Sequence, residues 1–284
     1  MTRRKFLLST LAVGLGGAGV AAYGRFLEPH WLETNRERIP VFSTEAQIAI
    51  RLLHLSDFHA SAAVPMNFIS DAVDLALSHQ PDLVCLTGDF ITAAIPNDAN
   101  AYREILNRLP TAAPTFACLG NHDGGTWLAR RGGYTDTGQV GELLAQSGVI
   151  PLVNASLDIE VKGHALRIVG LGDLWSGAFM PEGILSTAHS EMPVLVLSHN
   201  PDSKERLADY AWDVMLCGHT HGGQIRIPFI GTPFAPVRDH RYVEGLHEWN
   251  GRWIHITRGV GNVHGVRVNC RPQVSVLELV GAGA

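Results

Sequence analysis

The sequence predicts an α/β fold in which two β-sheets pack face to face with helices outside them. Three observations support this prediction. Short apolar runs typical of buried strands recur along the chain, helical patterns lie between several of them, and a hairpin and a strand-rich tail follow. Alternation of strand and helix favours parallel pairing, whereas a hairpin pairs its strands antiparallel. We therefore expect strands that pair in both directions.

The first 28 residues are typical of a twin-arginine export signal or an N-terminal anchor. Arg3, Arg4 and Lys5 precede an uncharged stretch over residues 6–22 that is rich in Gly, Ala, Leu and Val. Paired arginines before an apolar stretch direct a protein to the twin-arginine machinery. The glycines make the stretch a weak candidate for a permanent membrane span. We expect export to the periplasm or the outer face of the inner membrane, with retention as an anchor as the alternative.

The rest of the chain is predicted as a lead-in over residues 29–46 and one domain over residues 47–284. No repeat, low-complexity tract or long linker divides this part of the sequence. The whole chain carries 22 Lys and Arg against 27 Asp and Glu, a formal net charge of −5. Such a protein offers no basic field to hold nucleic acid, so we expect no nucleic-acid partner.

Strands and helices of the domain are predicted from the spacing of apolar residues. Steps of three and four residues favour helices over 69–77, 102–109 and 140–145. The segment 159–166 is typical of a hairpin, and the tail 252–279 of further strands. Six apolar runs are short enough to be buried strands; they cover residues 48–55, 82–87, 115–119, 166–171, 194–198 and 213–217.

Polar clusters follow five of these strands, at residues 56–59, 88–89, 120–123, 198–200 and 218–221. Ligands of α/β sheets bind beyond the carboxyl ends of strands, so we expect the clusters to converge there. Asp57 and His59 are separated by one residue, as are His219 and His221. Residues two apart in an extended segment point to the same side, so each pair can face one ion or two neighbouring ions.

The clusters supply seven groups that bind metals: Asp57, His59, Asp89, Asn121, His199, His219 and His221. These are too many for one tetrahedral ion but suit two ions of higher coordination that share a carboxylate. Nitrogen and oxygen donors without thiolate favour Mn, Fe, Zn or Co over Mg or Ca, which prefer oxygen alone. The sequence therefore predicts two divalent ions.

Single motifs of this kind are common, and Gly172-Asp173 is a second Gly-Asp pair after a predicted strand. We prefer Asp89 as the ligand because it lies in order between the first cluster and Asn121. Asp173 is then placed at the rim of the site. Taken alone, His199 would be a structural histidine at a strand end, and only the joint pattern makes it a ligand.

The ordered motifs resemble the calcineurin-like metallophosphoesterase family, and within it the exported phosphodiesterases. All the metal motifs are present in order, and further matches extend from the twin-arginine head to residue 272. The resemblance implies an α/β fold, a four-layer αββα sandwich of two mixed β-sheets flanked by helices. It also implies which residues share an ion: Asp57, His59, Asp89 and His221 hold one, and Asp89, Asn121, His199 and His219 hold the other, with Asp89 as the bridge.

The implied chemistry is hydrolysis of a phosphoester, foremost a phosphodiester. Two ions roughly 3.5 to 4 Å apart polarise a phosphoryl group and lower the pKa of a bridging water, so that hydroxide attacks in line. His122 is predicted to stabilise the phosphoryl oxygens or to protonate the leaving oxygen. Asp123 is predicted either to hold the other ring nitrogen of His122 or to cap the following segment.

Two inserts, over residues 124–136 and 224–242, are predicted to border the cleft. Guanidinium groups pair with phosphate oxygens, although a solvated loop arginine is the alternative at each position. The candidates for substrate contact are Arg130, Arg131, Arg238, Arg241 and Arg258. The second insert is unusually apolar and could accept an acyl chain, touch a membrane surface or pack over the sheet.

The expected substrate is a phosphodiester or pyrophosphate, either a small molecule or linked to lipid. The resemblance also admits a UDP-2,3-diacylglucosamine pyrophosphohydrolase of lipid A biosynthesis. Export argues against it because that precursor is cytoplasmic, unless the N-terminus stays as an anchor that faces inward. A third alternative is a non-catalytic, metal-dependent scaffold that binds a partner through the apolar insert. Asn121 and His122 are both present, which favours the enzyme.

Overall fold

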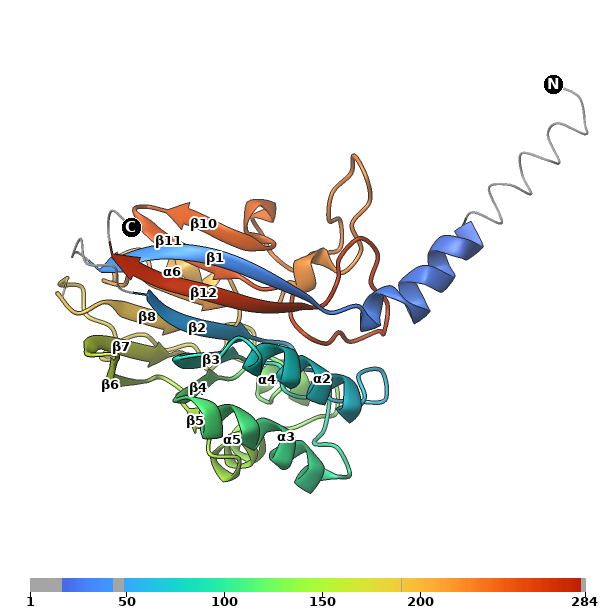
Figure 1. Cartoon of the computed structure of the whole chain (residues 1–284), viewed down its shortest axis with the longest axis horizontal. Coiled ribbons are helices and arrows are strands. Elements are labelled where there is room, and N and C mark those ends of the chain that lie inside the picture. The colour runs from blue at the N-terminus through green and yellow to red at the C-terminus, as the bar shows by residue number, and fades with distance from the viewer. Residues whose placement is uncertain (1–16, 43–48, 190, 282–284) are drawn as a thin grey trace, which may run out of the picture.

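Two six-stranded sheets lie at the centre of the molecule (Figure 1), in a computed structural model that describes residues 17–42, 49–189 and 191–281. The first sheet has the order β1 (Glu33–Phe42), β12 (Gln273–Gly281), β2 (Ala49–Leu55), β3 (Leu83–Thr87), β4 (Thr115–Cys118) and β5 (Ile150–Pro151). The second has the order β10 (Gly245–Trp249), β11 (Arg252–Ile256), β9 (Val214–Cys217), β8 (Val194–Leu197), β7 (His164–Gly170) and β6 (Ala155–Val161).

Both sheets are mixed, which confirms the predicted fold class. In the first sheet β12 pairs with β2 antiparallel, whereas β2, β3, β4 and β5 pair in parallel. In the second, β7, β8, β9 and β11 pair in parallel, and the hairpins β6–β7 and β10–β11 are antiparallel. The parallel strands end at one edge of each sheet, which is where ligands of such sheets bind.

Helices cover the outer face of the first sheet. They are α2 (Met66–Leu77), α3 (Ala99–Ala112) and α5 (Gly138–Gln146). Their apolar faces, with Ile69, Leu106 and Leu144, pack against Leu53 and Leu86 of the sheet in one buried cluster. The three helices confirm the predicted helical patterns and extend each of them by a few residues.

A thinner layer covers the outer face of the second sheet. Its helix α6 (Ser203–Arg206) is a single turn, and loops supply the rest of the cover. Trp212 and Tyr242 from these loops pack on Met215 and Ile254 of the sheet. The other short elements are α4 (Thr126–Ala129) and the 3-10 turns η1 (Glu28–His30), η2 (His221–Gly223) and η3 (His240–Tyr242).

The two sheets bury a largely apolar layer between them, which also holds a few polar side chains. Leu52 and Leu83 of the first sheet pack against Ile168 and Leu216 of the second. His54 of β2 and His255 of β11 also meet in this layer, with their Nδ1 atoms 2.8 Å apart, and both side chains are fully buried. This pair links the two sheets directly.

Strand β1 was not predicted, because residues 29–46 were expected to be a lead-in. The strand pairs in parallel with β12, from Glu33 opposite Gln273 to Pro40 opposite Val280. It lies at the edge of its sheet, and its sequence is mostly polar, although Ile39 is fully buried. Charged edge strands lack the apolar run by which buried strands are found.

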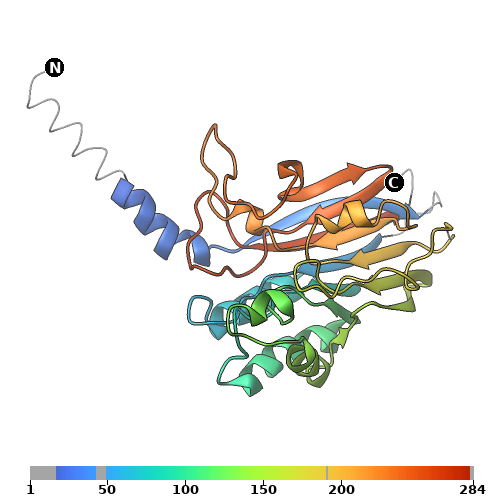
Figure 2. The same cartoon turned by 180° about the vertical axis from the view of Figure 1, so that it is seen from behind.

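The N-terminal segment is helical over residues 17–26 and extends away from the body in both views (Figures 1 and 2). Its end is attached to the body: the Arg267 amide donates to the Gly24 carbonyl at 2.9 Å, and buried Glu28 accepts from the Asn269 amide at 2.9 Å. The predicted boundary at residue 28 therefore falls inside a contact region. The paired arginines Arg3 and Arg4 lie outside the described residues. Among the residues described, we find no helix with the length and apolar character needed to cross a bilayer.

Candidate metal centre

Five strands from both sheets place the predicted ligands together. Asp57 follows β2, Asp89 follows β3, Asn121 follows β4, His199 follows β8 and His219 follows β9. All seven predicted ligands are buried. The fold therefore brings the polar clusters together, as predicted. The site lies at the edge where the parallel strands of both sheets end.

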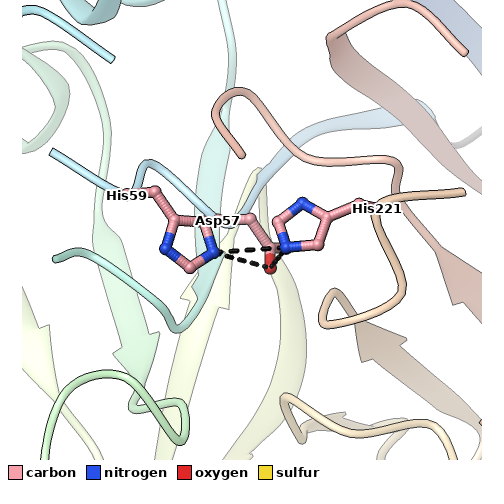
Figure 3. Close-up of side chains that lie close together, drawn as sticks. All are labelled: Asp57, His59 and His221. Atoms are coloured by element: carbon pink, nitrogen blue, oxygen red, sulfur yellow. Dashed lines mark hydrogen bonds and ion pairs between the residues drawn. The ribbon is translucent and has the colours of Figure 1, made fainter. Parts of the chain in front are cut away.

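One group of donors consists of Asp57, His59 and His221 (Figure 3). His221 Nε2 lies 3.5 Å from Asp57 Oδ1 and 3.2 Å from His59 Nε2. His59 Nε2 is 3.9 Å from the same carboxylate oxygen. The His219 amide donates to both oxygens of Asp57 at 3.2 Å, which fixes the orientation of that carboxylate.

A second group consists of Asp89, His199 and His219. His199 Nε2 lies 3.2 Å from Asp89 Oδ2 and 3.2 Å from His219 Nδ1. Asp89 Oδ2 is also 3.4 Å from His59 Nε2, so one oxygen contacts both groups. His219 therefore belongs to the second group and His221 to the first. This agrees with the prediction that such a pair can face two neighbouring ions.

The backbone at the ligands is unusual. Five of them have a φ between 47° and 70°: Asp57, His59, Asp89, His219 and His221. The sequence argument assumed extended segments, and this reason was wrong, because left-handed turns aim the side chains instead. A residue other than glycine in this region costs about 1–2 kcal/mol, and such strain gathers at functional sites.

Glycines let the ligand loops approach one another. A Cβ at Gly120 would overlap the carboxylate of Asp89, and a Cβ at Gly218 would overlap the side chains of Ser56 and Asp57. Only glycine fits where a backbone lies this close to a ligand. The Gly-Asn-His-Asp and Gly-His-Thr-His motifs therefore begin with glycine for a steric reason.

The donors fit a divalent metal. The atoms of each group lie within 4.8 Å of one another. Asn121 Oδ1 and His219 Nε2 are buried and have no hydrogen-bond partner within the described part of the chain. Buried polar atoms are normally satisfied, so these two atoms can take an ion or water as partner. The mixture of imidazole, carboxylate and amide suits a transition metal.

Electrostatics act differently on the ligand histidines. Burial lowers the pKa of His59 and of His219 to about 3, so both imidazoles are neutral and have a lone pair to give. Burial also opposes the charged form of His199, but the Asp89 carboxylate outweighs it and raises the pKa of His199. The His199 Nδ1–H donates to the Thr87 carbonyl at 2.6 Å, which leaves Nε2 facing the site. Such an outer hydrogen bond fixes the ring of a metal ligand.

His122 lies beside the two groups. One of its ring nitrogens is within 4.8 Å of donor atoms of His59 and Asp89. Its amide donates to Asp89 Oδ1 at 2.8 Å, and its Nδ1–H donates to the Thr92 carbonyl at 2.6 Å. Thr92 was not foreseen, and only the fold brings the residues after β3 to this ring.

Asp123 has a different role from the orienting one considered for it. Its carboxylate accepts the amides of Asp89 at 2.8 Å, Phe90 at 2.7 Å and Gly120 at 2.8 Å. The ring of His122 is held by Thr92 instead. Asp123 thus joins the ligand loops after β3 and β4 and positions Asp89 through its backbone.

Two tryptophans flank the centre. The Trp127 ring lies 4.5 Å from the His122 ring, and the Trp175 ring lies 4.3 Å from the His219 ring. Asp173 accepts the Trp175 amide at 2.7 Å, so the second Gly-Asp pair holds this rim loop. Trp175 was missed, although its position just after that pair was a usable signal.

The predicted substrate arginines occupy different surroundings. The Arg131 guanidinium lies 3.8 Å above the Trp127 ring and so borders the site. Arg241 pairs with Asp239, and Arg258 pairs with Glu33 and donates to Gln273 at 2.8 Å. Arg130 and Arg238 are exposed. Of these five, the Arg131 guanidinium is the one that stacks on an aromatic ring beside the centre.

Arg267 is a buried residue that the sequence analysis missed. Its guanidinium donates to the carbonyls of Arg258 at 2.8 Å, Gly259 at 3.2 Å and Gly261 at 2.6 Å, and it approaches that of His221 at 3.5 Å. It thereby holds the loop under Asp57 and His221. No motif marks it, because a loop arginine is ordinarily solvated.

Comparisons with known proteins agree with this geometry. The sequence model of a family described as calcineurin-like phosphoesterase matches residues 50–223. The chain is 43% identical over 280 residues to phosphodiesterase YaeI of Escherichia coli strain K12, covering 99% of this chain and 100% of that protein. It is 26% identical over 304 residues to the UDP-2,3-diacylglucosamine pyrophosphatase LpxG of Chlamydia muridarum, covering 90% and 91% of the two chains. The predicted resemblance is confirmed.

Proposed function

The chain belongs to the calcineurin-like phosphoesterase family, and from this premise we propose that it hydrolyses phosphodiesters with two divalent ions. It is a metal-dependent phosphoric ester hydrolase. The observation that carries the proposal is the double group of donors that share Asp89 Oδ2, 3.4 Å from His59 and 3.2 Å from His199. The similarity to a phosphodiesterase over the whole chain supports the choice of a diester.

The chain's own residues divide the work as follows. Asp57, His59 and His221 would hold one ion, and Asn121, His199 and His219 the other, with Asp89 between them. When bound, the ions supply Lewis-acid polarisation of the phosphoryl group and hydroxide near neutral pH. His122 is held at Nδ1 by the Thr92 carbonyl, and its other ring nitrogen would protonate the leaving oxygen. Trp127 and Trp175 limit the access of water at the rim.

The direct test is turnover by the full chain of bis(p-nitrophenyl) phosphate beside p-nitrophenyl phosphate, with Mn²⁺, Fe²⁺, Zn²⁺ and Co²⁺ added one at a time. We expect the diester to be hydrolysed faster than the monoester, and elemental analysis to find two ions per chain. Faster turnover of the monoester would contradict the diester assignment. A single ion per chain would contradict the two-ion scheme.

A pyrophosphatase is the second candidate, favoured by the similarity to LpxG over 90% of the chain. A pyrophosphatase of that kind cleaves UDP-2,3-diacylglucosamine and releases UMP. Incubation with this substrate distinguishes the candidates. Release of UMP faster than hydrolysis of the aryl diester would replace the first proposal by the second.

Export through the twin-arginine route belongs to the same proposal. Arg3 and Arg4 before an uncharged stretch support it. Replacement of both by Lys is expected to keep the protein in the cytoplasmic fraction, whereas the unaltered chain reaches the periplasm or the outer face of the inner membrane. Unchanged delivery of the Lys variant would mean an ordinary signal or an anchor.

A further inference from the structure

A cavity of about 340 Å³ opens beside the metal ligand His221. Sites for small molecules have volumes of about 300–1,000 Å³, so this cavity can hold part of a substrate. Its walls come from the turn that carries His221, from the apolar insert that follows and from the loop after β11; they include His221, Gln224, Ile225, Phe234, Pro236 and His264. A group placed here would be adjacent to a phosphoryl group at the metal centre.

The walls suit an apolar group. Ile225, Phe234 and Pro236 present hydrocarbon. The Thr220 hydroxyl is already used, because it donates to the Val243 carbonyl at 2.6 Å and accepts the Gly222 amide. The polar side chains of Gln224 and His264 also line the cavity, so its apolar part is the side formed by Ile225, Phe234 and Pro236.

The insert that forms part of the cavity is exposed and apolar. Phe229 is fully exposed, and Ile230 and Phe234 are exposed by 70% and 68%, which is far more than large apolar residues usually are. Of these three, Phe234 lines the cavity. In both views this insert lies at the same end of the molecule as the helix over residues 17–26 (Figures 1 and 2).

The end of that helix also exposes apolar residues. Phe26 and Leu27 at its end are exposed. Hydrogen bonds connect the two parts through one loop: Arg226 donates to the Val268 carbonyl at 2.8 Å, and Arg267 donates to the Gly24 carbonyl at 2.9 Å. Exposed apolar residues beside a catalytic centre mark a place where apolar ligands enter.

We propose that this cavity binds the alkyl or acyl chain of the substrate, so that the enzyme acts on lipid-linked phosphodiesters. The proposal rests on the proposed function, because the alkyl or acyl chain enters the cavity while the phosphoryl group of the same substrate lies at the metal centre. The exposed apolar residues let the alkyl or acyl chain pass from a lipid surface into the cavity without crossing water.

The test compares p-nitrophenyl ethyl phosphate with p-nitrophenyl octyl phosphate, each below its micelle concentration. We expect kcat/KM to be at least about tenfold higher for the octyl ester, since each buried methylene favours binding. The double variant Ile225→Ser, Phe234→Ser should bring the ratio close to one. The matched control is Leu157→Ser, an exposed apolar residue on β6, which should keep the ratio. An equal ratio in the double variant and the unaltered chain would overturn the proposal.

Binding without turnover separates this proposal from the proposed function. Calorimetry should show octanesulfonate binding at least about tenfold tighter than ethanesulfonate, and the double variant should lose the difference. If neither ester is hydrolysed but octanesulfonate is preferred, the proposed function fails and the cavity assignment stands. If both esters are hydrolysed alike and the sulfonates bind alike, the cavity assignment fails and the phosphodiesterase stands.

Phe234→Ser alone, at an exposed position, replaces the double variant if that variant does not fold.

Discussion

Asp89 is placed to serve both groups of donors, since one of its oxygens contacts His59 and His199. We expect Asp89→Ala to lose both ions and to lower kcat/KM by more than about 10²-fold, because even an outer partner of a ligand is worth 10–100-fold. The measurement is elemental analysis of the purified variant together with diester turnover.

Asp173→Asn is the matched control for this substitution. It alters the second Gly-Asp pair, but its remaining oxygen can still accept the Trp175 amide, as Asp173 Oδ2 does at 2.7 Å. This variant should keep two ions and most of the activity. Two ions per chain in Asp89→Ala would contradict the shared role of Asp89.

His122 contacts the site without belonging to the proposed ligands. His122→Ala should keep two ions and its fold, while kcat falls by roughly 10²- to 10⁴-fold, the range for a lost general acid. The loss should be larger for an alkyl diester than for an aryl one, since an alkoxide needs a proton to leave and a nitrophenolate does not. Equal losses for both esters would indicate electrostatic stabilisation of the phosphoryl oxygens instead. Loss of an ion would make His122 a ligand.

The residues that could be predicted are those whose chemistry is visible in a motif. Asp57 and His219 were found because a carboxylate and an imidazole follow apolar strands in a recognisable order. Thr92 acts through its carbonyl oxygen, which every residue type has, and its role appears only when the chain is folded. The Arg267 guanidinium donates to backbone carbonyls of a distant loop, which no motif in the sequence marks. Asp123 was found but misread, because its choice of backbone amides over His122 depends on loop geometry.

At the scale of elements, β2 and β11 are linked by the buried pair His54 and His255. Burial lowers the pKa of His255 from its usual 6.5 to about 3, and burial lowers that of His54 as well. Between pH 6.5 and 3 these histidines are protonated in the unfolded chain but neutral in the folded protein. Their contribution to the free energy of unfolding is therefore fully present above about pH 6.5 and is lost as the pH falls toward 3.

Replacement of His255 by Leu tests this linkage. The variant should be less stable at pH 7, because the Nδ1 of His54 loses its partner at 2.8 Å. Its stability should also depend less on pH between 6 and 4, by up to about 1.4 kcal/mol per pH unit. Urea unfolding at several pH values in one Mn²⁺ buffer measures both quantities.

Leu216→Ala is the control for the His255 variant. Leu216 lies opposite His255 in the sheet and is fully buried, so its truncation costs about 2–5 kcal/mol without removing a titrating group. Its pH dependence should match that of the unaltered protein. A His255→Leu variant with the same pH slope as this control would exclude the pair as a source of acid sensitivity.

Elements were predictable in proportion to their apolar pattern. Strands β3, β8 and β9 are entirely buried and were found within a residue or two of their ends. β1 was missed because its edge position leaves most of its side chains in solvent, so its sequence resembles a linker. Its place in the sheet is set by pairing with β12, more than 200 residues away in the chain, which local spacing cannot reveal.

At the scale of the whole molecule, the metal centre exists because two sheets present their strand ends at one place. Neither sheet holds a full ligand set: Asp57, Asp89 and Asn121 come from the first, and His199 and His219 from the second. The segment before β1 adds a third support, since its residues bond to the loop that carries Arg267 and Cys270. Cys270 donates from its thiol to the His221 carbonyl at 3.0 Å, so this loop reaches a ligand.

The end of the N-terminal segment, at Gly24 and Glu28, bonds to the folded body. A chain that begins at residue 23 keeps the Gly24 carbonyl that accepts from Arg267 and the Glu28 carboxylate that accepts from Asn269 and Cys270. A chain that begins at residue 29 loses them, which should cost about 3 kcal/mol and lower Tm by roughly 6–12 °C. The shorter chain should also retain less metal, because the loop that supports His221 is loosened. Thermal unfolding and elemental analysis of the two chains measure these effects, and Glu28→Gln in the longer chain should give an intermediate Tm. Equal Tm and metal content in both truncated chains would show that the folded domain begins at residue 29 and does not need the contacts of Gly24 and Glu28.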